Sequence, residues 1–340
     1  MIEIAGLTKA YGAATVLEGI DLRVDDARIA AVVGPSGAGK STLARCINLL
    51  ERPTSGSIRV GGRDLAGLSG RELQRARRQI GTVFQSANLL RRLTAAQNIA
   101  LPMRNAGVGD AEIRARVGEL LDRVDMLHRA NHYPAQLSGG QRQRIGIARS
   151  LALQPAVLLS DEATSGLDPD ATRAILGLLT ELRDDLGVTI VVITHEMDVV
   201  RSIADHVAHL DQGRIVEQGA VADVVLRSDS ALSRALLPLP SAGTVDGLRV
   251  WTVRYDSPHV SPLWLSLASS ALGVDIALLA ASVEDASSTT VGRLAIALPP
   301  HLDDIRVAEV FTNLGLRAAP APAPVVGFVG VPGRRAEPAA

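Results

Sequence analysis

The sequence contains few aromatic residues, a single cysteine and almost no net charge. Cys46 alone cannot form an internal disulfide or a thiolate zinc site, so nothing indicates secretion. The 35 basic and 36 acidic side chains leave a net charge of -1, so we expect no nucleic-acid partner drawn by a basic surface. Only eight residues are aromatic, three before residue 240 and five after it: Tyr11, Phe84, Tyr133, Trp251, Tyr255, Trp264, Phe311 and Phe328. This imbalance indicates a domain boundary, as does a length of 340 residues.

Long apolar runs are also missing. The N-terminal segment MIEIAGLTKAYG lacks a basic head followed by an apolar stretch, so no signal peptide is expected. The most apolar long window, 263–282, is interrupted by serines and by Asp275, which is too polar for a membrane-spanning helix. We therefore expect a protein that is soluble or that sits on a membrane through a partner.

The first two thirds of the chain follow an α/β rhythm. From residue 2 to about 237, short β-branched or Leu-rich runs precede longer helical stretches, which is typical of a largely parallel sheet. Three runs are apolar on both faces and predict buried strands: 29–33, 157–160 and 188–194. The Arg- and Glu-rich segment 91–129 predicts a helical insertion. We assign residues 1–237 to this domain and 238–246, with its prolines and small residues, to a linker.

The last third predicts a second, α+β domain. Segments 248–255, 261–272, 273–281, 292–298 and 303–314 fit strand, helix, strand, strand and helix, which is most of a ferredoxin-like unit. A closing strand is not evident, because Pro320, Pro322 and Pro324 interrupt the place where it should follow. We therefore end this domain, 247–318, before a Pro/Ala-rich tail, 319–340, that is expected to be disordered.

A phosphate-binding loop follows the first buried strand. GPSGAGKS fills the pattern G-x-x-x-x-G-K-[ST] between a strand and a helix, and its backbone amides can cradle phosphates. Lys40 would reach the β- and γ-phosphates, and the Ser41 hydroxyl would ligate Mg²⁺. Lys40 is one of two lysines beside 33 arginines, which argues against a chance match. The predicted ATP-binding residues from this loop are Gly34, Pro35, Ser36, Gly37, Ala38, Gly39, Lys40, Ser41 and Thr42.

Two further strands deliver titratable groups to the same edge of the sheet. Asp161 and Glu162 end one strand, where Asp161 can hold Mg²⁺, directly or through water, and Glu162 can deprotonate the attacking water. His195 ends another and can hydrogen-bond the γ-phosphate and that water. Solvated carboxylates and a capping histidine are the alternatives. A zinc-protease reading of His195 and Glu196 fails because residue 199 is valine.

A second anion site is indicated by LSGGQ at 137–141. Ser138, Gly139, Gly140 and Gln141 lead into a helix, with no phosphate of their own chain to bind. With this motif the chain resembles the ATP-binding subunits of ABC transporters over residues 2 to about 237. The matching features are, in order, Tyr11, GPSGAGKS, Gln85, LSGGQ, LLSDE, SGLD at 165–168 and His195.

The resemblance implies a fold and roles for these residues. It implies a P-loop NTPase core of ABC type with antiparallel β and helical subdomains. Tyr11 would stack on adenine, and Gln85 would sense Mg²⁺ and the water while linking to a membrane subunit. Ser138 to Gln141 would contact the ATP held by a second copy of the chain, and Asp168 would couple the two sites of that dimer. Catalysis is thus assigned to Glu162, His195 and Gln85, and the metal to Ser41, Gln85 and Asp161.

The resemblance narrows to the ATPase subunits of methionine importers. The similar stretches are 46–58, 78–90, 133–152, 158–169, 193–210 and the extension 247–317. This implies a peripheral protein at the cytoplasmic face of the membrane, bound to multi-spanning permease subunits and served indirectly by a substrate-binding protein. The C-terminal domain would bind methionine and inhibit import. Import of another amino acid, polar or basic, and a non-transport ABC ATPase acting on nucleic acid or the ribosome are the alternatives.

Some positions depart from the family pattern. Ala27 stands where a glycine is usual, and alanine disfavours a left-handed turn. Residues 86–88, SAN, replace a bulkier aromatic pair, so the contact with the membrane subunit is expected to be trimmed. Trp251, Tyr255 and Trp264 are read as core residues of the small domain, with a methionine pocket as the alternative.

Overall fold

The computed structural model describes residues 1–226, 230–238, 247–255, 260–286 and 289–321. The chain forms two compact units, Met1–Leu236 and Leu237–Ala340, and each is described by itself. Most of the predicted linker and most of the predicted tail, 239–246 and 322–340, lie outside the described residues.

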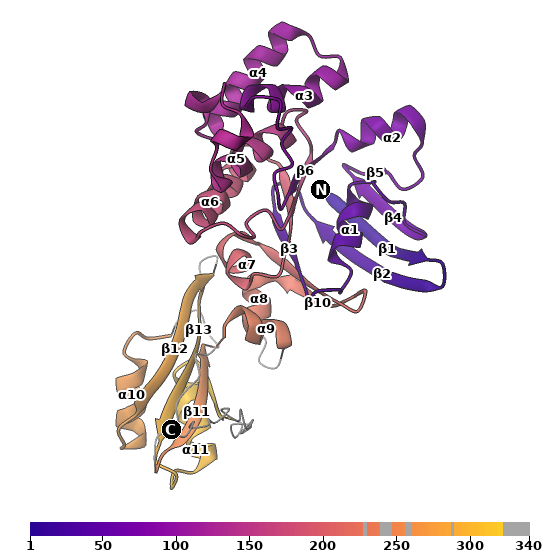
Figure 1. The fold of residues 1–340 in the computed structure, drawn as a ribbon. Helices are drawn as coiled ribbons and strands as arrows, with labels where there is room; N and C mark the ends of the chain where they lie inside the picture. The colour runs from indigo at the N-terminus through magenta and orange to yellow at the C-terminus, as the bar shows by residue number, and fades with distance from the viewer. Residues whose placement is uncertain (227–229, 239–246, 256–259, 287–288, 322–340) are drawn as a thin grey trace, which may run out of the picture. The chain divides into compact units, whose positions relative to one another are not determined.

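A six-stranded sheet forms the centre of the first unit (Figure 1). Its order is β10 (Arg214–Ala220), β9 (His206–Asp211), β3 (Ile29–Val33), β8 (Thr189–Thr194), β7 (Val157–Asp161) and β6 (Ile80–Phe84). All neighbours are parallel except β10 and β9. The three strands expected from runs that are apolar on both faces, β3, β7 and β8, lie in the middle and have helices on either side. Val191 and Val192, for example, belong to different hydrophobic clusters.

An antiparallel sheet packs on one face of that centre. It consists of β2 (Ala14–Val24), β1 (Ile2–Tyr11), β4 (Ser55–Val60) and β5 (Arg63–Asp64). Helix α1 (Lys40–Ile47) shares one core with both sheets and contributes Leu43, Cys46 and Ile47. Burial raises the pKa of the Cys46 thiol to about 11, so this cysteine packs as a small apolar side chain.

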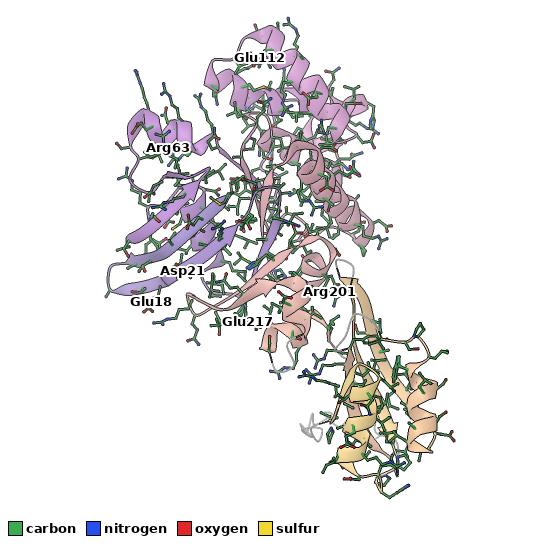
Figure 2. All side chains as sticks on the ribbon, turned by 180° about the vertical axis from the view of Figure 1, so that it is seen from behind. Glu18, Asp21, Arg63, Glu112, Arg201 and Glu217 are labelled. Carbon is green, nitrogen blue, oxygen red and sulfur yellow. The ribbon has the colours of Figure 1, made fainter. Side chains whose placement is uncertain are left out.

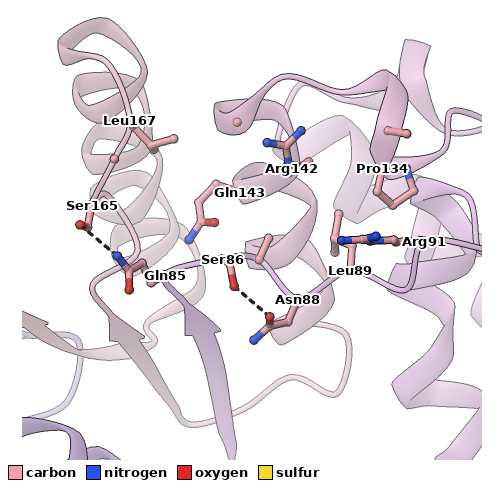
Figure 3. Close-up of a pocket in the computed structure, with 14 residues that line it drawn as sticks. Gln85, Ser86, Asn88, Leu89, Arg91, Pro134, Arg142, Gln143, Ser165 and Leu167 are labelled. Atoms are coloured by element: carbon pink, nitrogen blue, oxygen red, sulfur yellow. Dashed lines mark hydrogen bonds between the residues drawn. The ribbon is translucent and has the colours of Figure 1, made fainter.

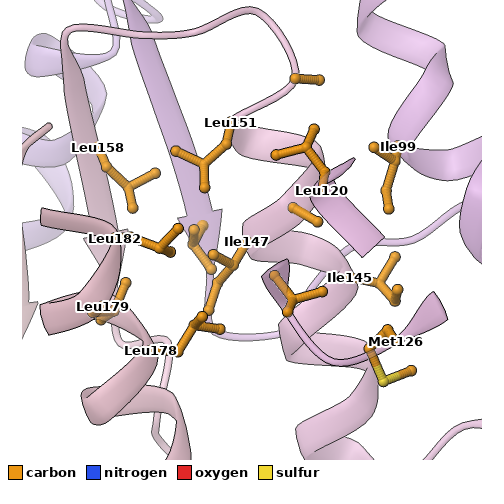
Figure 4. Packing of buried hydrophobic residues seen from close by; sticks show 14 of the residues in the cluster. Ile99, Leu120, Met126, Ile145, Ile147, Leu151, Leu158, Leu178, Leu179 and Leu182 are labelled. Carbon is orange, nitrogen blue, oxygen red and sulfur yellow. The ribbon is translucent and has the colours of Figure 1, made fainter. Parts of the chain in front are cut away.

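Helices cover the other face. They are α3 (Ala95–Ala106), α4 (Asp110–Arg123), α5 (Gly139–Ser150) and α6 (Pro169–Leu186). Figure 4 shows how Leu151, which follows α5, and Leu182 of α6 pack towards Leu158 of β7, while Ile99 and Leu120 extend the same cluster into α3 and α4. The predicted helical insertion therefore folds as α3, α4 and the short 3₁₀ turn Leu127–Arg129. A separate helix, α2 (Gly70–Arg77), leads into β6.

Three further short helices lie in the described part of the first unit. They are α7 (Met197–Ile203), which begins two residues after His195, α8 (Val221–Leu226) and α9 (Ala231–Leu236). Arg201, labelled in Figure 2, donates from Nη1 to the Leu236 carbonyl oxygen at 2.6 Å. The helix after His195 is thus tied to the last turn of this unit.

The second unit has the ferredoxin-like order of elements. Its antiparallel sheet runs β12 (Ala277–Ala286), β13 (Thr289–Leu298), β11 (Arg249–Tyr255) and β14 (Leu316–Pro320), and its helices are α10 (Trp264–Leu272) and α11 (Asp304–Asn313). Trp251, Trp264 and Phe311 are buried in its core, and the rings of Trp264 and Phe311 lie 6.1 Å apart at a tilt of 55°. The aromatic residues that follow residue 240 and are described here therefore mark a small core of their own.

One sequence expectation needs correction. The closing strand exists as β14, so an end of the domain at residue 318 is wrong and residues 319 and 320 belong to the sheet. A strand is allowed there because β14 lies at the sheet edge and Pro320 is its last residue. Ala27 does adopt the disfavoured left-handed backbone, with φ of 52°, in the turn between β2 and β3.

Candidate nucleotide-binding site

The phosphate loop lies between β3 and α1. Lys40 is 9% exposed, and its Nζ donates to the carbonyl oxygens of Gly34 at 2.6 Å and Pro35 at 2.9 Å. An ammonium group has three hydrogens, so this geometry fixes the side chain along the loop and leaves one donor for a phosphate. Gly39 has φ of 105°, and a Cβ there would come within 2.8 Å of Leu17 Cδ2. Only glycine therefore fits at the point where the loop enters the helix.

The N-terminal end of α1 fits an anion. Gly39 caps this helix without a side chain, so the first amides, those of Lys40, Ser41 and Thr42, have no intrahelical acceptor and face outward from the helix end. At the other end of the loop, a Cβ on Gly34 would stand 2.0 Å from the carbonyl oxygen of Leu210 in β9. Close backbone packing thus holds the loop on the sheet.

Asp161 and Glu162 stand at the carboxyl end of β7, beside β8. Burial raises the pKa of Asp161, and the neighbouring Glu162 charge raises it further, whereas Arg45 and Lys40 oppose the shift. The Asp161 carboxylate therefore lies within electrostatic reach of the phosphate-loop lysine. A carboxylate and a serine hydroxyl on adjoining strand and helix ends are oxygen ligands of the kind that Mg²⁺ prefers.

Glu162 and His195 meet at this edge. His195 Nδ1 is 3.2 Å from Glu162 Oε1, and the Glu162 amide donates to the carbonyl oxygen of Ile193 at 2.9 Å. Glu162 has φ of 49°, a conformation that is uncommon for residues other than glycine. The predicted base and the predicted switch histidine are therefore brought together, with the glutamate held in a strained turn.

Gln85 follows β6 and lines a pocket of about 670 Å³ (Figure 3). Its Nε2 donates to Ser165 Oγ at 3.2 Å, which joins the segment after β6 to the segment after β7. The other labelled residues lining this pocket are Ser86, Asn88, Leu89, Arg91, Pro134, Arg142, Gln143 and Leu167.

Two residues of α5 hold the backbone on either side of Gln85. Gln143 Nε2 donates to the Phe84 carbonyl oxygen at 2.9 Å, and the Arg149 guanidinium donates to the carbonyl oxygens of Ala87 at 2.6 Å and Asn88 at 2.8 Å. Sequence analysis missed both residues. Nothing in the spacing of QRQRIGIARS distinguishes them from the other polar residues of that helix.

The LSGGQ segment begins α5. Ser138 Oγ accepts from the Gln141 amide at 3.2 Å, while Gln141 Oε1 accepts from the Ser138 amide at 2.9 Å, which forms a capping box. Cβ atoms on Gly139 and Gly140 would lie 3.3 Å from Leu167 Cδ2 and 3.2 Å from Ala171 Cβ. The two glycines thus let the SGLD segment and α6 approach closely.

Asp168 caps α6, since its Oδ1 accepts from the Ala171 amide at 2.8 Å. Across the described part of the chain, the side-chain hydrogen bonds of Ser138, Gln141 and Asp168 are these local ones and do not reach the phosphate loop. Within one chain, these hydrogen bonds therefore do not link the LSGGQ segment to Lys40.

Comparison with known proteins places this site in a family. The family described as "ABC transporter" matches residues 17–165. The chain is 54% identical over 303 residues to methionine import ATP-binding protein MetN 1 of Rhodococcus jostii, which covers 88% of this chain and 90% of that protein. It is 48% identical over 322 residues to methionine import ATP-binding protein MetN 3 of Pseudomonas fluorescens, covering 93% and 98%. The chain belongs to the ATP-binding subunits of ABC transporters.

Solved structures agree with the ABC fold of the first unit. A dimeric ATP-binding cassette, MJ0796, in a post-hydrolysis state bound to ADP and Pi, is 34% identical with a TM-score of 0.59, and covers 65% of this chain and 99% of that one. The structure of cbiO1 from Clostridium perfringens, part of an ABC transporter complex, is 32% identical with a TM-score of 0.62, covering 66% and 89%. The predicted P-loop core with antiparallel and helical subdomains is therefore confirmed, and the protein is an ATPase that binds ATP.

Tyr11 of this ABC ATPase ends β1 and is 45% exposed. Its hydroxyl donates to Glu51, which raises the pKa of the phenol, and Lys9 Nζ lies 4.8 Å from the ring centre. The ring is thereby oriented and open to solvent.

Among the helices of the described ranges, none has both the length and the apolar character that a membrane span requires.

Proposed function

We propose that the protein is the ATP-hydrolysing subunit that energises import of methionine through a membrane permease. The observation that supports this most directly is the extent of the similarity. Relatives named for methionine import match over 303 to 322 residues, well beyond the 236 residues of the first unit. The second unit, which an ATPase cassette alone does not need, is thus shared with them.

ATP would bind along the phosphate loop. The backbone amides at the start of α1 and the spare donor of Lys40 suit the phosphates, and Tyr11 offers an exposed ring to the adenine. Ser41, Gln85 and Asp161 would hold Mg²⁺, which supplies positive charge for the developing phosphate oxyanions. Glu162 would take the proton of the attacking water, and His195 would orient Glu162 and the γ-phosphate.

A second copy of the chain would complete each site. Ser138, Gly139, Gly140 and Gln141 present a helix N-terminus whose local hydrogen bonds leave its face free for the phosphate of another subunit. One solved relative, the cassette MJ0796, is described as dimeric in two structures. Asp168, which fixes the start of α6 beside this segment, would couple the two sites.

The pocket beside Gln85 would receive a segment of the permease. It is lined by both polar and apolar residues of the segment after β6, the LSGGQ helix and the SGLD turn, so a bound segment would touch all three. Ser86, Ala87 and Asn88, which line this pocket, have smaller side chains than an aromatic pair would have at this place. The protein would sit peripherally at the cytoplasmic face of the membrane and meet a substrate-binding protein only indirectly.

The second unit would bind methionine and restrain import when methionine accumulates on the ATP side. Its ferredoxin-like sheet has a core separate from that of the first unit, so it can respond to a ligand of its own. This part of the proposal predicts that truncation after Pro238 relieves inhibition by methionine and leaves ATP hydrolysis in place.

Reconstitution with the permease subunits in proteoliposomes tests the proposal. With Mg-ATP and the substrate-binding protein supplied, we expect uptake of labelled methionine that stops when Lys40→Ala replaces the native chain. Uptake of a polar or basic amino acid instead of methionine would contradict the substrate. ATP hydrolysis stimulated by RNA or ribosomes, but not by the permease, would contradict a role in transport.

A further inference from the structure

Three arginines stand side by side across three strands of the second unit. In the antiparallel register, Arg254 of β11 pairs with Arg317 of β14 on one side and with Arg293 of β13 on the other. Directly opposite residues of antiparallel strands project from the same face, with Cβ atoms about 4.5–5.5 Å apart. The register therefore forms an arginine row of Arg317, Arg254 and Arg293.

The arginine row lies on the sheet face that α10 and α11 do not cover. Trp251 and Val253 of β11 belong to the core shared with these helices, and side chains alternate along a strand, so Arg254 points to the opposite face. The neighbouring same-face positions carry short side chains, namely Ala319, Thr252 and Ala295, which also pair in register. Long cationic side chains thus border a shelf of small ones.

The arginine row is partly buried. Arg293 is 8% exposed and donates from Nη1 to the Leu237 carbonyl oxygen at 3.4 Å, and both Arg293 and Arg317 make further interactions. Among the described residues, Nη1 of Arg254 is a buried atom with no hydrogen-bond partner. A buried guanidinium N–H without an acceptor is costly, and like charges directly opposite each other destabilise a sheet.

We propose that the arginine row binds a phosphate-class oxyanion. The guanidinium is a planar fork that matches a tetrahedral oxyanion through paired N–H···O bonds, and Nη1 of Arg254 has no acceptor within the described part of the chain. A doubly charged phosphate compensates neighbouring cations better than a carboxylate does. The hydroxyl of Thr252, two residues before Arg254 on the same face of β11, adds a further donor.

Phosphate binding to the full-length chain tests this site. A non-hydrolysable ATP analogue with Mg²⁺ first occupies the nucleotide site, including the position of the γ-phosphate, and inorganic phosphate is then titrated by calorimetry. We expect one further phosphate per chain. Arg254→Gln should weaken it about tenfold or more, since one charge-assisted hydrogen bond is worth at least that factor. Acetate should bind about tenfold more weakly than phosphate, and equal affinity would overturn the assignment to a phosphate-class anion.

Matched variants keep the test decisive. Arg306→Gln removes the same charge from the exposed surface of α11 and should leave phosphate affinity within about twofold. Arg317→Gln alters only the edge strand and should weaken phosphate binding as Arg254→Gln does, so it decides the matter if the Arg254 variant does not fold. The proposal is overturned if the native chain with its nucleotide site filled binds no inorganic phosphate. It is also overturned if Arg317→Gln and Arg306→Gln bind phosphate with equal affinity.

Discussion

His195 Nδ1 lies 3.2 Å from Glu162 Oε1, so the ends of β8 and β7 meet in a pair of groups that can share a proton. The backbone supports the same pairing, because the Glu162 amide donates to Ile193, two residues before His195. The side chain and the backbone of Glu162 are therefore each held by the end of β8, while the carboxylate remains partly exposed at the sheet edge. A water molecule attacking a phosphate on the neighbouring loop would find a base that is already positioned.

Replacement of that base should slow hydrolysis and spare binding. Glu162→Gln keeps the side-chain shape but cannot accept a proton, so we expect ATP turnover to fall about 10²–10⁴-fold with ATP affinity nearly unchanged. Turnover and nucleotide affinity measured on the same preparation check this. Glu196→Gln, one residue after His195, is the control and should stay within about threefold of the native rate. An equally active Glu162→Gln enzyme would remove Glu162 from the base role.

Asp161 makes stability depend on pH. Burial, followed by the Glu162 charge, raises its pKa in the folded state above the ordinary aspartate value. As pH rises, the unfolded chain releases this proton first, so folding loses stability until pH has passed the folded pKa. Without nucleotide or metal, Asp161→Asn should therefore melt above the native protein at pH 7–8, and the difference should shrink as pH falls toward the ordinary carboxyl range.

Thermal melts across that pH range provide the measurement. Asp170→Asn is the control, because Asp170 is exposed in the first turn of α6 and should give no gain at pH 7–8. A gain for Asp161→Asn that stays constant between pH 4 and 8 would show that the buried charge is not its cause.

The adenine role of Tyr11 has its own test. Tyr11→Ala removes the exposed ring and should weaken ATP binding about tenfold, because stacking of a base on an aromatic side chain contributes about 1–3 kcal/mol. Tyr11→Phe keeps the ring, loses the hydrogen bond to Glu51, and should bind ATP within about threefold of the native chain. Equal affinity of both variants for ATP would mean that adenine does not stack on this ring.

Sequence was most informative where one segment decides its own structure. The strands β3, β7 and β8 could be predicted because each is apolar on both faces, and the phosphate loop because its glycines and Lys40 are consecutive. The strand β14 could not be predicted, because Pro320 argues against a strand at that place. The proline is tolerated because β14 pairs with one neighbour only and lies at the edge of the sheet. Arg149 acquires its partners, Ala87 and Asn88, only when α5 packs beside β6. These residues are 62 and 61 positions away in the sequence, so no local pattern predicts the contacts.

Ala27 offers a prediction about stability that leaves the active site untouched. It is exposed in a turn with φ of 52°, and a left-handed alanine costs about 1–2 kcal/mol, partly offset by the greater freedom that glycine has when unfolded. Ala27→Gly should therefore raise the free energy of unfolding by about 0.5–1 kcal/mol. Denaturant unfolding of the first unit measures it. Ala115→Gly, the same change on the exposed side of helix α4, should instead lower stability by about 1 kcal/mol. If both substitutions destabilise alike, the left-handed turn carries no strain, and the glycine usual at this position is no more stable there than alanine.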